Sequence, residues 1–100
     1  MDNRLRISGL LAKQPETRHS PAGVPITRFT LQHESLQQEA GMQRRAICNI
    51  AVIASGEEML KQTKGLQGGQ QLRVSGFLCR ANNRQGENRL ILHAEQIELL

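Results

Sequence analysis

The side chains best suited to chemistry in this sequence are arginines that gather around polar, turn-like segments. They are Arg18, Arg44, Arg45, Arg80, Arg84 and Arg89. Guanidinium groups bind phosphates and stack on bases, so this grouping indicates a nucleic-acid surface. Arginines beside turns are also common as plain solvated charges, and the sequence alone leaves both interpretations open.

The overall charge agrees with a polyanionic partner. The chain has 13 Lys and Arg residues against 9 Asp and Glu residues, a formal net charge of +4, and its isoelectric point is near 9.8. The sequence contains no signal-peptide pattern and no apolar run of about 18 residues. We therefore expect a cytoplasmic protein that does not enter a membrane.

Aromatic side chains are scarce, because the chain has 2 Phe residues and neither Trp nor Tyr. Proteins that bind single strands usually stack bases on aromatic rings, at about 1 to 3 kcal/mol per base. We assign Phe29 and Phe77 to the core of the protein. Any binding of DNA is therefore expected to be weak, led by arginine and sensitive to salt.

No residue pattern in the sequence indicates catalysis or a cofactor. His33 is followed by Glu34, but neighbours along a strand point to opposite faces and form no catalytic pair. Cys48 and Cys79 lack the spacing of metal ligands, and we expect reduced thiols in the core, without a disulfide or a metal site. The expected protein is not an enzyme.

Five segments with alternating apolar and polar residues predict the β-strands that must position these side chains. The predicted strands are 3–13, 26–35, 44–54, 71–81 and 89–100. Gly9 and Gly76 interrupt two of them, where a bulge or a sharp bend would curl a sheet. In the third strand apolar residues fall on both faces, which predicts burial or contact on both sides.

The connecting segments are polar or rich in turn residues. Segment 14–25 contains all 3 prolines and is predicted as an irregular loop, and segment 37–43 is predicted as a hairpin tip. Ser55 and Glu58 have the spacing of a capping box, which predicts a helix over 57–64 that ends at Gly65. Segment 82–88 joins the last two strands.

This order of elements fits a single domain over residues 1–100. Three strands, a short helix and two more strands are the order of the OB-fold, an all-β, five-stranded barrel with a helix between strands 3 and 4. An SH3-like barrel or an open sheet is compatible with the same order. In an OB-fold barrel, segments 14–25 and 82–88 would form the two walls of a nucleic-acid groove.

Longer segments carry a more specific signal. NRLRISG (3–9), SPAGVP (20–25), LQHES (31–35), QEAG (38–41), VSGF (74–77) and LHAEQIEL (92–99) together resemble the primosomal replication protein N family. The resemblance implies a bacterial OB-fold homodimer that binds single-stranded DNA, contacts the primosomal helicase and helps to load the next restart protein. It implies no catalysis. The alternative is a protein-interaction module of the primosome with little DNA binding of its own.

The resemblance also implies which positions contact DNA. They are Arg18, Ser20, Arg44, Ile47, Asn82, Arg84 and Arg89. Better known members carry lysine at the position of Asn82, arginine at that of Glu34, and aromatic residues at those of Met42 and Ile47. The basic patch and the stacking contribution are therefore expected to be reduced here. For the dimer, the first strand is expected to pair with its counterpart across a two-fold axis.

Overall fold

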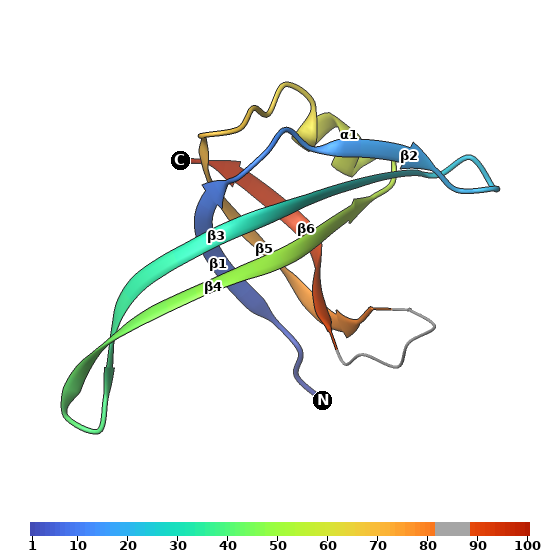
Figure 1. The fold of residues 1–100 in the computed structure, drawn as a ribbon. Helices are drawn as coiled ribbons and strands as arrows, with labels where there is room; N and C mark the ends of the chain where they lie inside the picture. The colour runs from blue at the N-terminus through green and yellow to red at the C-terminus, as the bar shows by residue number, and fades with distance from the viewer. Residues whose placement is uncertain (82–88) are drawn as a thin grey trace.

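The structure is a computed structural model of the chain and describes residues 1–81 and 89–100. It consists of strands and one short helix (Figure 1). The elements are β1 (Leu5–Leu11), β2 (Glu16–His19), β3 (Pro25–Glu39), β4 (Met42–Ser55), α1 (Glu57–Thr63), β5 (Gln71–Arg80) and β6 (Leu90–Leu99). No helix in the described ranges is long and apolar enough to cross a membrane.

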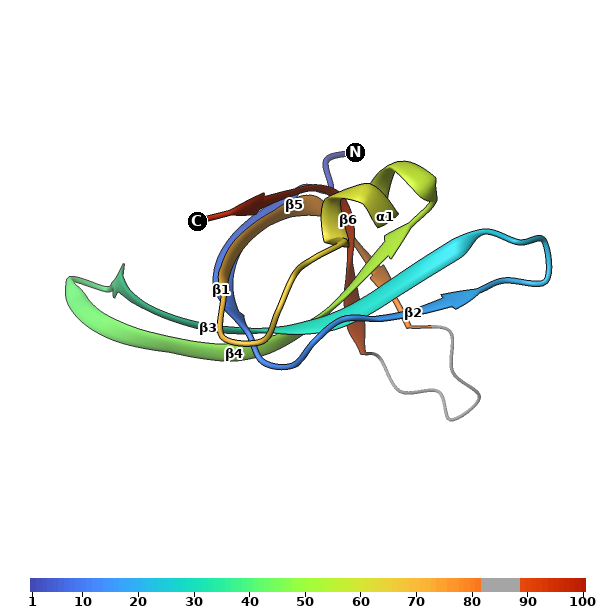
Figure 2. The same cartoon turned by 90° about the horizontal axis from the view of Figure 1, so that it is seen from above.

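The strands close into a barrel. The sheet order is β1-β5-β6-β4-β3-β2, and an additional pairing between β1 and β3 joins the two ends of the five-stranded part. The short β4–β6 pairing is parallel and the others are antiparallel. Helix α1 lies between β4 and β5 in the chain and covers one end of the barrel (Figure 2). This arrangement confirms the predicted OB-fold.

Two strand glycines allow the sheet to close. A Cβ atom on Gly9 would lie 2.6 Å from the carbonyl oxygen of Gln32, at the point where β1 turns from β5 toward β3. Gly76 lies at a register shift between β5 and β6, and a Cβ atom there would overlap the carbonyl oxygen of His93. Both glycines are therefore required by close backbone approach, at the positions where the sequence predicted a bulge or a sharp bend.

The core is built from aliphatic side chains on the inner face of the barrel. Its members are Leu11, Phe29, Leu31, Val52, Leu66, Leu72, Val74 and Leu92. Met59 of α1 is also buried and packs where the helix meets β3, β4 and β6. Burial of each such side chain contributes about 1.5 to 3 kcal/mol, and along β3 and β5 these residues alternate with more exposed ones.

The prediction that segment 14–25 is an irregular loop was wrong. Glu16–His19 form β2, which pairs with β3 from Pro25 to Arg28. Pro15 precedes β2 and Pro21 follows it, so neither removes a donor from the ladder. Pro25 lies opposite His19 at the last paired position. Prolines at the ends of an edge strand are compatible with pairing.

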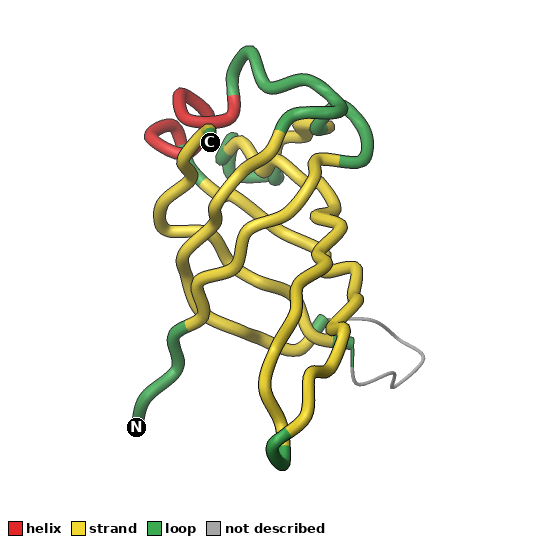
Figure 3. Tube along the Cα trace, turned by 90° about the vertical axis from the view of Figure 1, so that its left-hand side faces the viewer, coloured by secondary structure: helices red, strands yellow, loops and turns green. Residues whose placement is uncertain are grey.

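The hairpin between β3 and β4 is longer than predicted. The two strands stay paired to Glu39 and Met42, and a two-residue turn replaces the expected tip over 37–43. Both turn residues, Ala40 and Gly41, have positive φ angles, of 53° and 76°, as a type I′ turn requires. Residues 34–47 therefore form an arm that projects from the barrel (Figures 1 and 3).

Three smaller predictions also fail. Ile47 on β4 is 63% exposed, so within the described chain this strand is not covered on both sides. Cys48 and Cys79 are both exposed rather than part of the core. Helix α1 begins after Gly56 with no side-chain cap, because Ser55 is paired with Ile26 as the last residue of β4. The helix does end before Gly65, whose φ is 86°.

Candidate nucleic-acid interface

The register of the strands assembles one row of side chains across the outer face of the barrel. Glu16 lies opposite Arg28, Arg28 opposite Ile53, Ile53 opposite His93, and His93 opposite Phe77. The neighbouring positions Thr27, Phe29, Val52 and Leu92 are buried, so alternation turns this row outward. The row joins five strands, β2 to β6.

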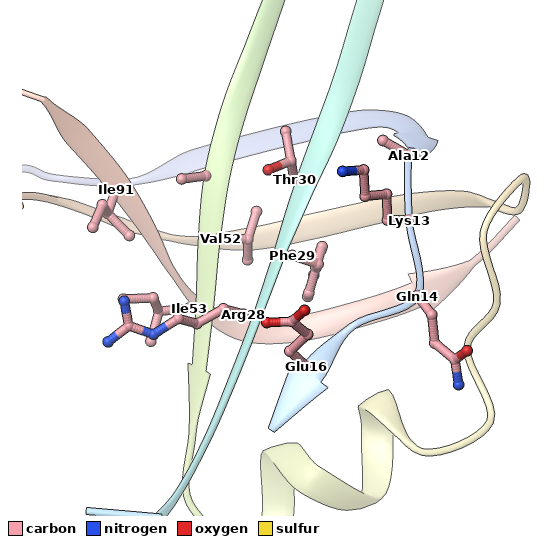
Figure 4. A pocket seen from close by; sticks show the side chains of 11 residues that line it. Ala12, Lys13, Gln14, Glu16, Arg28, Phe29, Thr30, Val52, Ile53 and Ile91 are labelled. Atoms are coloured by element: carbon pink, nitrogen blue, oxygen red, sulfur yellow. The ribbon is translucent and has the colours of Figure 1, made fainter. Parts of the chain in front are cut away.

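Two hollows lie along this face. The first, of about 430 Å³, is bounded by segment 12–16 and by β3 and β4, and Figure 4 shows Lys13, Glu16 and Arg28 around it. The second, of about 490 Å³, lies between β4, β5 and β6. They share Arg28, Ala51, Ile53 and Ile91 in their walls. The two hollows are therefore adjacent, and we name them together the basic groove.

Cations dominate the basic groove. Its basic side chains are Lys13, Arg28, Arg80 and Arg89, and Glu16 is its one acidic residue among the described residues. In the part of the chain that the structure describes, no carboxylate lies within 4.0 Å of these four cations. Their charges are therefore available to an anion running along the groove.

Other arginines of the chain are already engaged with acids. The pairs are Arg4–Glu95 at 3.6 Å, Arg44–Glu39 at 3.1 Å, Arg73–Glu98 at 3.6 Å, and Arg45–Glu34. The Arg45 guanidinium donates a hydrogen bond to Glu34, and this bond and its charge lower the pKa of that carboxyl. Glu34 is exposed, so the pair contributes little to stability. Among the described residues, the arginines of the arm are thus paired with carboxylates, whereas the cations of the basic groove are not.

Two of the residues predicted from the sequence lie on this face. Arg18 on β2 is opposite Ile26 and so projects to the same side as Arg28. Arg89 lies at the edge of the basic groove, where its carbonyl accepts a hydrogen bond from the N–H of Ala81 at 2.7 Å. Asn82 and Arg84 lie outside the described residues.

Ser20 has a structural contact of its own. Its hydroxyl oxygen accepts a hydrogen bond from the N–H of Val24 at 3.1 Å. The backbone N–H of Ser20 donates to the carbonyl of Val24 at 2.9 Å, and the N–H of Gly23 donates to the carbonyl of Ser20 at 2.8 Å. Ser20 therefore closes the turn between β2 and β3 and holds Arg18 at its place beside that turn.

Arg44 and Ile47 lie on the arm, away from the basic groove. Ile47 is opposite Glu34, eight residues along β3 from the residue that faces Arg18, which corresponds to about 26 Å of strand. Arg44 is opposite Gln37 and projects from the other side of the arm. The structure therefore does not bring these two residues together with Arg18 and Arg89.

The assignment of Phe77 to the core was wrong. Its side chain is 39% exposed and its ring stacks on that of His93, with centroids 5.1 Å apart and an angle of 4° between the planes. Alternation from the buried Leu72 and Val74 places Phe77 on the outer face, so the signal was present in the sequence. Phe29 is buried as expected.

His33 has a structural role, because both of its ring nitrogens form hydrogen bonds within the barrel. Its Nδ1–H donates to the carbonyl oxygen of Ser8 at 2.6 Å, and Nε2 accepts from the hydroxyl of Ser35 at 2.7 Å. The bond to Ser8 ties β3 to β1 where the barrel closes, and the bond to Ser35 lies within β3. The described ranges contain no group of three or more His, Cys, Asp or Glu residues able to hold a metal ion.

A five-stranded barrel with a helix at one end defines an OB-fold, and the basic groove on its outer face gives this barrel a surface suited to an anionic chain. Residues 3–96 match the sequence family described as another single-strand binding protein family. The chain belongs to this family, and within it to the replication restart proteins named PriB, as a 49% identical relative shows.

That relative is the replication restart protein PriB of Photorhabdus laumondii, aligned over 98% of this chain and 93% of its own length. A solved structure of the protein priB from Ralstonia solanacearum is similar over 100% of both chains, with a TM-score of 0.82 and 27% identity. A variant of the single-stranded DNA binding protein from Thermus aquaticus matches with a TM-score of 0.79 and 25% identity, over 99% of this chain and 50% of that one.

Proposed function

We propose that this chain is a replication restart protein that binds single-stranded DNA and has no catalytic activity of its own. The observation that carries the proposal is the basic groove, whose four cations have no carboxylate partner among the described residues. The names of the relatives and of the matching family support the same function.

In this proposal the DNA backbone crosses the outer face of the barrel from β2 toward β5 and β6. Arg18, Arg28 and Arg89 bind its phosphates, together with Arg80 and with Asn82 and Arg84, which lie outside the described residues. Ser20 acts by holding the β2–β3 turn. Arg44 and Ile47 contact a more distant part of the strand along the arm.

The test is a fluorescence-anisotropy titration of a labelled oligonucleotide at several salt concentrations. With about five phosphates neutralised, one by each of the arginines proposed to bind phosphates, the slope of log K against log salt is expected to be roughly −3.5, at about −0.7 per phosphate. Replacing Arg28 and Arg89 by Ala should reduce the slope to roughly −2. The matched control is Arg73→Ala, because Arg73 is paired with Glu98 on the same outer face.

Two outcomes would contradict the proposal. Absence of binding at low salt would remove DNA binding as the function of the groove. Normal binding by the Arg28/Arg89 double variant would place the DNA elsewhere on the molecule. Arg73→Ala should bind with nearly the same slope as the unsubstituted protein, since its charge is already engaged.

We further propose that the protein works as a homodimer and as an adaptor that stabilises the primosomal helicase and helps to load the downstream restart protein. The edge of β1 supports the dimer. β1 pairs with β5 from Leu5 to Leu10, but its other edge pairs with β3 only at Leu10 and Leu11 among the described residues. The open backbone groups from Leu5 to Gly9 can pair with a second copy.

The second candidate function is a protein-interaction module of the primosome with little DNA binding. The arm favours it, because Leu36, Met42 and Ile47 are 67%, 72% and 63% exposed there. Exposed apolar side chains on a projecting hairpin are typical of a surface that binds another protein. The anisotropy titration separates the two functions, since this candidate predicts no salt-dependent binding of the oligonucleotide.

A further inference from the structure

Phe77 and His93 form an aromatic pair at one end of the basic groove. They lie opposite each other in the β5–β6 register, and their rings are 5.1 Å apart and within 4° of parallel. Phe77 remains 39% exposed although it is one of only 2 Phe residues in a chain without Trp or Tyr. A parallel pair of this kind leaves ring faces on which a further planar group can stack.

The two sides of the pair differ in charge. His93 lines the hollow of about 490 Å³, whose lining includes three arginines, Arg28, Arg80 and Arg89. Phe77 lines a separate hollow that contains Asp2, Arg4 and Glu95, of which Arg4 and Glu95 are paired with each other. An anionic strand is therefore attracted to the His93 side and gains nothing from the other side.

The walls of the hollow beside His93 also suit a flat, partly apolar group. Ile53 lies directly opposite His93 in the parallel β4–β6 pairing, and Ile91 is two residues before His93 on β6. Both isoleucines line the hollow. An aromatic face, aliphatic walls and arginines at the rim are the chemistry that recognises a nucleotide within a single strand.

We propose that one nucleobase of the bound strand stacks on the imidazole of His93, which Phe77 supports from behind. The phosphates on either side of that base bind Arg28, Arg80 and Arg89. This stacking site rests on the proposed binding of single-stranded DNA and adds a base contact to a groove otherwise built on charge. It replaces in part the aromatic residues that the arm lacks at Met42 and Ile47.

The first test compares a dT oligomer with an oligomer of the same length made of abasic deoxyribose phosphates. His93→Leu and Phe77→Leu each place an aliphatic side chain at the position and remove the stack, so the dT oligomer should bind about tenfold more weakly. The salt slope should stay the same because no phosphate contact is lost. Binding of the abasic oligomer should not change, and His93→Phe should retain binding of dT.

The outcomes separate this site from the proposed function. If the unsubstituted protein binds neither oligomer, the proposed function fails. If it binds both and the two leucine variants bind dT normally, DNA binding stands and the stacking site is overturned. An equal loss for dT and abasic oligomers would also overturn it, because the substitutions would then act on the backbone contacts.

A second variant guards against misfolding of the leucine variants. His93→Trp keeps an aromatic ring at the site. Because the unsubstituted sequence has no tryptophan, this residue is then the single source of tryptophan fluorescence. Its fluorescence should be quenched by the dT oligomer and much less by the abasic oligomer. The control is Leu99→Trp, at the far end of β6, where the side chain is 59% exposed. Equal quenching at both positions would overturn the proposal.

Discussion

Single residues set how the strands of this barrel meet. At Gly76 the register between β5 and β6 shifts by one position, and the backbone of His93 passes through the space that a side chain would occupy. The shift occurs one residue before Phe77, so the same glycine also fixes how the aromatic pair stands on the outer face. A local steric requirement is thus linked to the proposed stacking site.

Gly76→Ala is expected to destabilise the protein by about 2 kcal/mol or more, because the new methyl group would displace the backbone of β6. The measurement is urea unfolding followed by circular dichroism. Gly68→Ala is the matched control, since a Cβ atom there would lie 3.5 Å from its nearest neighbour, an ordinary contact. It should change stability by less than about 0.5 kcal/mol. Equal stability of the two variants would show that β6 can move aside.

Among the elements, α1 and the arm have opposite roles, and each carries one methionine. Met59 on α1 is 8% exposed, while Met42 at the start of β4 is 72% exposed. The helix covers one end of the barrel and adds to the core, whereas the arm leaves the barrel and buries little. The free energy of unfolding should therefore depend much more on contacts of the helix than on contacts at the tip of the arm.

The two methionines give a matched comparison. Met59→Ala should cost about 2 kcal/mol of unfolding free energy or more, because it opens a cavity between α1 and the barrel. Met42→Ala should be nearly neutral for stability. Urea unfolding of both variants measures the difference. A large effect of Met42→Ala would mean that the arm is packed in solution, against a second copy or another part of the chain.

At the scale of the whole molecule, one edge of β1 has no strand partner from Leu5 to Gly9 among the described residues, and a second copy of the chain could pair with it. We expect sedimentation equilibrium at micromolar concentration to give a mass of twice 11.2 kDa. Amide hydrogens from Leu5 to Gly9 that point to the open edge should exchange slowly in the dimer and faster on dilution. A monomer at this concentration, with fast exchange along β1, would contradict the proposed dimer.

Much of the fold was accessible from the sequence because it depends on local patterns. Alternation placed the barrel strands, Gly65 marked the end of the helix, and Gly9 and Gly76 marked the bends. β2 was not predicted because the prolines of segment 14–25 indicate a loop. They lie outside the four residues of β2 and so do not prevent its pairing with β3. Ser55 was wrongly predicted as a helix cap because it is the last paired residue of β4. Its partner, Ile26, is distant in the sequence, and the S-x-x-E spacing contains no information about that pairing.

The sequence by itself determined an all-β barrel of basic character with arginines near its loops, since side-chain period, backbone sterics and net charge are properties of the chain. Only the tertiary structure decided which charges act together. Lys13, Arg28, Arg80 and Arg89 come from four separate segments and meet in one groove, while Arg44 and Arg45 are paired with acids on the arm. The physical reason is the register between strands distant in sequence, which is set by burial of the core.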